Sequence, residues 1–389
     1  MQKQSSLLLW AALASATLAV MAGSILGPIV NKMKEPLGAS TESIGLVITT
    51  HGLFIALSSP FLGYLIDKIG RKKVYLAGLF TYGVSGGLGF FITSFWLMIL
   101  TRAVLGVGVA GIVASITTML ADVYKGKELQ KVMGYRSSAE SLGGTIFPLI
   151  GGFLGVFAWN FPFLLYFLAL PLGAIVWWKV PETKSKGKKQ TEVGSVSFFK
   201  MLWNNRFLFY VYVLIFLAML NLYVVVVFVP QQLGEFGIKN TFEIGLFLMF
   251  LSGTGALASL AHGYIKSLAS YTKIVSFAFA FWILGFSTSF FSSNFWTLIP
   301  SLILVGVSQG LAIPTAYVLA TSSVEASLRG QTTSYLSSFG YLGQFMSPVI
   351  YGPIAGLIDL KWVFGASSIV NLICLLLILT YVKINQNKM

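Results

Sequence analysis

The sequence predicts an all-α polytopic membrane protein with twelve transmembrane helices in two pseudo-symmetric six-helix bundles. Three observations support this fold class. Of the 389 residues, 56% are apolar and 10% are charged, against roughly 25% charged in soluble domains. The apolar residues form twelve runs near the length of about 20 residues that a membrane-crossing helix needs. The two halves of the chain also match at a fixed offset. This composition, with a single cysteine, excludes an ordinary soluble enzyme, a disordered chain and a disulfide-rich scaffold.

The twelve apolar runs follow one another closely. They lie near 7–30, 43–66, 74–93, 95–121, 133–156, 160–179, 206–229, 241–265, 274–293, 295–323, 331–357 and 362–382. The short turns between them require neighbouring helices to be antiparallel, and the 40 glycines suit close helix contact in lipid. Lys3 and Ala14-Ser15-Ala16 resemble parts of a secretory signal, but the apolar stretch continues to Val30 and is too long for one.

The basic residues predict the orientation. With the N-terminus inside, all but six of the 26 lysines and arginines lie on the cytoplasmic side; Lys32, Lys34, Lys239 and Lys361 lie outside, and Arg102 and Arg136 lie within spans. The positive-inside rule therefore places both termini in the cytoplasm of a cell-membrane protein. The net charge of +14 is then explained by anionic inner-leaflet lipid, with no nucleic acid as partner.

A polar stretch at 181–205 divides the chain. It begins with a basic run and ends with four apolar residues on one helical face, as in an interfacial helix, namely Phe198, Phe199, Leu202 and Trp203. We therefore expect an N-terminal six-helix bundle over 1–180, a cytoplasmic basic linker over 181–205, and a C-terminal six-helix bundle over 206–389.

The two halves match at an offset of 200 residues, without a gap between residues 41 and 152. Phe95-Trp96 recurs as Phe295-Trp296, and Pro148 recurs as Pro348. Ordered matches that include Trp, Tyr and Pro are unlike chance similarity between apolar helices. Parallel six-helix repeats indicate a transporter with its substrate site between the halves.

The loop after the second span carries a charged motif over residues 63–73. Its main positions are Gly63, Asp67, Lys68, Gly70, Arg71 and Lys72. The motif resembles the G-x-x-x-D-[RK]-x-G-[RK]-[RK] signature of the major facilitator superfamily, and every position fits. The resemblance implies the twelve-helix major facilitator fold and a cytoplasmic gate latched by this loop.

Physical chemistry favours a latch at the same residues. Asp67 ends a helix, where the dipole disfavours an anion, so it needs a cation, and Arg71 is the nearest. Asp122 ends the fourth span and has the same need. We expect Gly63 to permit close packing of the second span. The alternative is an ordinary positive-inside loop. In the second half Ser267 replaces the aspartate, so the latch should be asymmetric.

Two further motifs lie within spans. Arg102, Gly106 and Gly108 resemble the family's R-x-x-x-G-x-G motif, which links the arginine to proton transfer; the alternative is a structural pair for a buried charge. In span five, the residues Gly143, Pro148, Gly151 and Gly152 resemble the antiporter motif G-x-x-x-G-P-x-x-G-G. Phe147 departs from it. This motif is associated with exporters of the drug:proton antiporter-1 type.

Few intramembrane residues can carry a proton. Glu140 is the one carboxylate that we place well inside a span, with Arg136 one turn earlier on the same face, and the pair is either a structural salt bridge or a proton site. His51 is a second carrier candidate or a packing histidine. In the second half, Asn221, Gln309 and Gln344 either line a cavity or bond neighbouring helices.

The sequence therefore favours proton-coupled export of a small amphipathic molecule by a monomer working through alternating access. The alternative is a facilitator or symporter for another solute, such as a sugar, a siderophore or a lipid-linked product. We find no Walker A sequence, no metal-ligand spacing and no cluster of catalytic residues. We expect no cofactor, no metal and no enzymatic activity; the partners are the substrate, protons and the bilayer.

Overall fold

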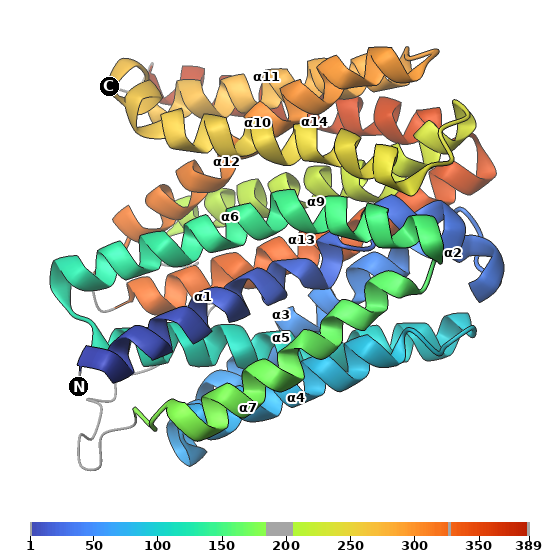
Figure 1. Ribbon diagram of the computed structural model, residues 1–389. Coiled ribbons are helices and arrows are strands. Elements are labelled where there is room, and N and C mark those ends of the chain that lie inside the picture. The colour runs from blue at the N-terminus through green and yellow to red at the C-terminus, as the bar shows by residue number, and fades with distance from the viewer. Residues whose placement is uncertain (1, 184–204, 326–327, 387–389) are drawn as a thin grey trace. The chain divides into compact units, whose positions relative to one another are not determined.

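The structure, a computed structural model, describes residues 2–183, 205–325 and 328–386 (Figure 1). The interfacial helix expected at 198–203 lies outside these residues. Within them the chain forms helices and connecting turns and contains no strand. It divides into two compact units, Met1–Ala39 with Leu46–Ser195, and Ser40–Gly45 with Val196–Met389.

The first unit contains the helices of the N-terminal half. They are α1 (Gln2–Ser24), the 3₁₀ turn η1 (Gly27–Ile29), α2 (Val30–Leu37), α3 (Ile44–Ile69, whose first two residues belong to the second unit), α4 (Arg71–Leu88), α5 (Phe95–Val123), α6 (Gly126–Phe157), the 3₁₀ segment η2 (Phe161–Leu168) and α7 (Ala169–Lys179).

The second unit contains the helices of the C-terminal half. They are α9 (Arg206–Glu235), α10 (Thr241–Leu268), α11 (Tyr271–Phe290), the 3₁₀ turn η3 (Phe295–Thr297), α12 (Leu298–Ser322), α13 (Arg329–Leu357) and α14 (Lys361–Gln386).

Helices occupy all twelve predicted positions, which confirms the predicted fold class. In the part of the chain that is described, ten segments are long and apolar enough to cross a membrane. The other two positions hold α4 and α13. Helix α4 has 18 residues and begins with three basic ones, and α13 begins with a polar turn. The sixth span differs from a continuous α-helix, because Phe161–Leu168 forms a 3₁₀ segment that follows directly on Asn160.

Motif glycines set the closest helix contacts of the first unit. A Cβ at Gly106 of α5 would overlap the carbonyl oxygen of His51, and one at Gly108 would lie 2.8 Å from the backbone nitrogen of Tyr82. A Cβ at Gly151 of α6 would overlap the carbonyl oxygen of Ile25. The span-four motif therefore packs α5 against α3 and α4.

The span-five motif packs α6 against the end of α1, which lies beside it (Figure 1). A Cβ at Gly143 would lie 3.3 Å from the Cα of Thr17. Pro148 and Gly152 are buried within α6. The motif is thus the contact surface along which the two helices pack.

Three buried tyrosine hydroxyls fasten α1 to its neighbours. Tyr75 and Tyr82 of α4 donate to the carbonyl oxygens of Ala11 (3.1 Å) and Leu18 (2.5 Å). Tyr166 of η2 donates to the carbonyl oxygen of Ala22 at 2.8 Å. Each hydroxyl is thereby satisfied in a region without water.

Candidate gating and coupling sites

Arg71 lies at the centre of a charged cluster at the lysine-rich end of the first unit. Its side chain is 6% exposed. The guanidinium contacts Asp67 at the end of α3 (3.3 Å) and Asp122 at the end of α5 (3.1 Å). One arginine therefore supplies the cation that both helix ends require, and it ties three helices together because it is itself the first residue of α4.

Glu182, which follows the sixth span, completes this cluster. Its two carboxylate oxygens accept hydrogen bonds from the backbone N–H groups of Arg71 and Lys72, each at 3.1 Å. The first N–H groups of a helix have no partner within it, and Gly70 at the cap has no side chain to offer. Glu182 therefore caps α4 from outside, where the helix dipole favours an anion.

Two other contacts join the segment after α7 to the cluster. The hydroxyl of Thr183 donates to Asp122 at 2.9 Å, and the ammonium of Lys72 donates to the carbonyl oxygen of Trp177 at 2.7 Å. Gly70 has a φ of 108°, and a Cβ there would lie 2.5 Å from Glu182. The backbone conformation favours glycine here, and a Cβ would also push the Glu182 carboxylate away from the amides that it caps.

Two residues of the loop motif stand apart from the cluster. Lys68 is exposed, with its ammonium 5.9 Å from the centre of the Tyr64 ring. At Gly63, a Cβ would meet no heavy atom of the described residues within 4 Å. The close packing expected at Gly63 therefore stays a prediction, since no helix of the first unit approaches this face of α3.

Arg102 of α5 is fully buried. Its Nη2 donates to the carbonyl oxygen of Gly86 at 3.1 Å. The guanidinium carbon lies 5.1 Å and 5.0 Å from the ring centres of Phe163 and Tyr166. Its Nε and Nη1 have no hydrogen-bond partner, and it makes no ion pair, among the described residues. Aromatic faces, rather than a carboxylate, stabilise this charge.

Arg136 and Glu140 form an ion pair on α6, one turn apart, with 3.0 Å between Nη2 and Oε1. Arg136 also donates to the hydroxyl of Thr117 on α5. The side chains are 13% and 33% exposed. His51 of α3 is buried, and its carbonyl packs on Gly106, one turn beyond Arg102 on α5. The structure thus brings Glu140 together with Arg136. His51 lies apart from this pair, near Arg102.

The polar candidates of the second half are buried among helices. Asn221 of α9 exchanges side-chain hydrogen bonds with Asn371 of α14 at 2.9 and 3.1 Å. Gln309 of α12 donates to the carbonyl oxygen of Ala218 at 2.8 Å. Gln344 is 1% exposed. For Asn221 and Gln309 the geometry favours helix bonding over cavity lining.

Sequence reasoning missed Glu182, Thr183 and Asn371. Glu182 had a recognisable signal, because it is an acidic residue directly after a span and α4 begins with three basic residues and no acidic cap. Asn371 offered none, since it is 150 residues from its partner.

The family follows from comparison with known sequences. A sequence model described as "Major Facilitator Superfamily" matches residues 12–274 and 263–388. The chain belongs to this superfamily. It is therefore a membrane transporter of small molecules and not an enzyme, as the sequence predicted.

Relatives with assigned functions are similar over most of their length. A bacillibactin exporter of Bacillus subtilis (strain 168) is 26% identical over 396 residues, covering 97% of each chain. The multidrug efflux protein YfmO of the same organism is 26% identical, covering 89% of this chain and 86% of the relative. The class B tetracycline resistance protein of Escherichia coli is 24% identical, covering 88% of this chain and 87% of the relative.

Solved transporter structures share the fold. A bacterial homologue of the human lysosomal transporter Spinster, in an inward-facing occupied conformation, superposes with a TM-score of 0.82 at 13% identity, covering 98% and 97% of the two chains. The nucleoside transporter NupG has a TM-score of 0.76 at 15% identity, covering 96% and 98%.

Proposed function

We propose that this transporter exports a small amphipathic molecule in exchange for protons, as a monomer in the cell membrane with both termini in the cytoplasm. The Arg136–Glu140 pair carries the proposal, because it holds a titratable carboxylate inside a span, 3.0 Å from its cation. An intramembrane ionisable residue is a functional candidate by default. The names of the exporter relatives support the direction of transport.

The proposed cycle uses the two charged groups differently. Asp67, Arg71 and Asp122 form the latch of the cytoplasmic gate, and the support for this role is that Arg71 joins the ends of α3, α4 and α5. Glu140 binds a proton and thereby loses its attraction to Arg136, whose bond to Thr117 keeps the freed guanidinium satisfied. The proton gradient supplies the drive, because each charge that crosses the membrane potential gains about 2.3 kcal/mol per 100 mV.

Transport in proteoliposomes tests the coupling. Purified full-length chain is reconstituted with an imposed pH gradient, with bacillibactin and tetracycline among the first substrates. Glu140→Gln should lose accumulation driven by the pH gradient and keep downhill exchange. His51→Gln is the control and should accumulate substrate as the unaltered protein does.

Two outcomes would redirect the assignment. Accumulation against a gradient by Glu140→Gln would remove Glu140 as the carrier and favour His51 or the Arg102 region. Transport by the unaltered protein that ignores the pH gradient would instead indicate a facilitator of another solute.

A further inference from the structure

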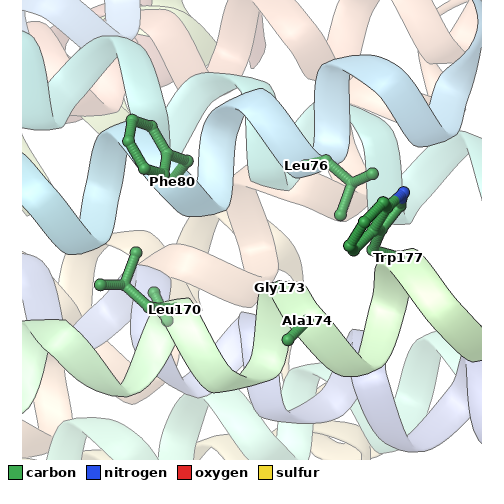
Figure 2. A pocket seen from close by; sticks show the side chains of 7 residues that line it. Leu76, Phe80, Leu170, Gly173, Ala174 and Trp177 are labelled. Carbon is green, nitrogen blue, oxygen red and sulfur yellow. The ribbon is translucent and has the colours of Figure 1, made fainter.

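Helices α4 and α7 leave an apolar groove of about 330 Å³ between them. In Figure 2, Phe80 and Leu170 lie at one end, and Leu76 and Trp177 lie at the other. Gly173 and Ala174 lie between, where their lack of bulk leaves the groove open. Its walls are hydrocarbon and aromatic, which suits a flexible alkyl chain.

The groove opens on the outside of the first unit. Phe80 and Trp177 are 65% and 67% exposed, and Ala174 is exposed as well. On a membrane protein, such exposed apolar surface contacts lipid tails. The groove can accommodate a tail by shape. Because all lipid tails are as apolar as the groove, this fit does not select one lipid over another. Selectivity must come from charge near the groove.

Lysines lie at the Trp177 end of the groove. Lys72 donates to the Trp177 carbonyl at 2.7 Å, so the first turn of α4 adjoins the last turn of α7. Lys73 follows in that first turn and Lys179 ends α7, and both are exposed. Neither makes an ion pair with a described residue. The acidic neighbours are already engaged, since Asp67 and Asp122 bind Arg71 and Glu182 caps α4.

We propose that this groove binds one acyl chain of an anionic phospholipid, with the lipid phosphate against Lys73 and Lys179. The groove has apolar walls, an opening toward the bilayer and, at one end, two lysines that have no acidic partner among the described residues. These features match the two parts of such a lipid. In the orientation proposed above, the lipid belongs to the cytoplasmic leaflet. The site requires nothing of the transported substrate, so the transport assay and the lipid assay can fail independently.

Native mass spectrometry of the full chain tests the site. The detergent-solubilised protein is titrated with phosphatidylglycerol and, separately, with phosphatidylcholine of the same acyl chains. We expect phosphatidylglycerol to be retained as a single tight adduct. Each lysine near a phosphate contributes about fivefold in affinity, so Lys73→Gln with Lys179→Gln should weaken retention about 25-fold. Lys127→Gln, at an exposed position in the first turn of α6, should not.

A second pair of variants tests the groove itself. Ala174→Phe fills the groove and should abolish the tight adduct. Ile175→Phe adds bulk at the next residue of α7, which is 44% exposed and does not line the groove, and should leave the adduct intact. Equal retention of the two lipids, or full retention by the double lysine variant or by Ala174→Phe, would overturn the proposal. So would a dimer of the unaltered chain that Ala174→Phe converts to monomer, because the groove would then be an interface between copies.

Discussion

Glu182→Ala should expose the start of α4 to solvent. The N–H groups of Arg71 and Lys72 have no acceptor within their own helix, and Glu182 accepts from both at 3.1 Å. Removing the carboxylate leaves these amides bonded only to water. The rest of α4 should keep its protection, because its amides bond within the helix.

The size of the effect follows from the geometry. A hydrogen bond to a charged group contributes about 1.5–3 kcal/mol. Glu182 is exposed, so we reduce this value for solvent screening to about 1 kcal/mol per bond. That corresponds to about fivefold faster exchange at each of the two amides.

Hydrogen–deuterium exchange with fragmentation that resolves single amides measures this effect. Glu128→Ala is the matched control, since it removes an exposed acidic residue from the first turn of α6 and leaves the α4 cap in place. Unchanged exchange at Arg71 and Lys72 in Glu182→Ala would refute the external cap. Equal acceleration in both variants would show that general charge, not the cap, protects the amides.

Two other predictions concern the latch and the packing motif. Asp67→Asn should abolish transport with little change in thermal stability, because Asp67 is 54% exposed. Arg71→Ala should lose both transport and thermal stability, since it leaves Asp122 without its cation. Normal transport rates in both variants would refute the latch. Gly151→Ala should lower the free energy of unfolding by about 1–3 kcal/mol, because the new Cβ would overlap the Ile25 carbonyl. Gly144→Ala should be nearly neutral, because its Cβ would lie 3.7 Å from Val20. Equal thermal midpoints for the two variants would contradict this prediction.

The sequence predicted what depends on local order. Twelve apolar runs predict helices because length and composition alone decide membrane insertion. The Asp67–Arg71 contact was predictable because the residues are one turn apart in number, and the position of Asp122 followed from its place at a helix end. The 3₁₀ form of Phe161–Leu168 was not predictable, since its apolar composition suits an α-helix equally well.

Contacts between distant segments were beyond sequence reasoning. Glu182 meets Arg71 across 111 positions, and their contact depends on how α7 packs on α4. The packing role expected for Gly63 stays a prediction, because a Cβ there would meet no heavy atom of the described residues within 4 Å.

The tyrosine contacts to α1 fix its register along the helix axis. Ala11, Leu18 and Ala22 are held at three heights by hydroxyls from α4 and η2. Sliding by one residue, or turning by a third of a revolution, would break all three bonds in a medium with no water to replace them. Helix α1 therefore moves only together with the helices that hold it. A spin label on α1 would report the displacement of α1, α4 and η2 together. Tyr82→Phe removes one of the three bonds and would begin to separate the motion of α1 from that of α4.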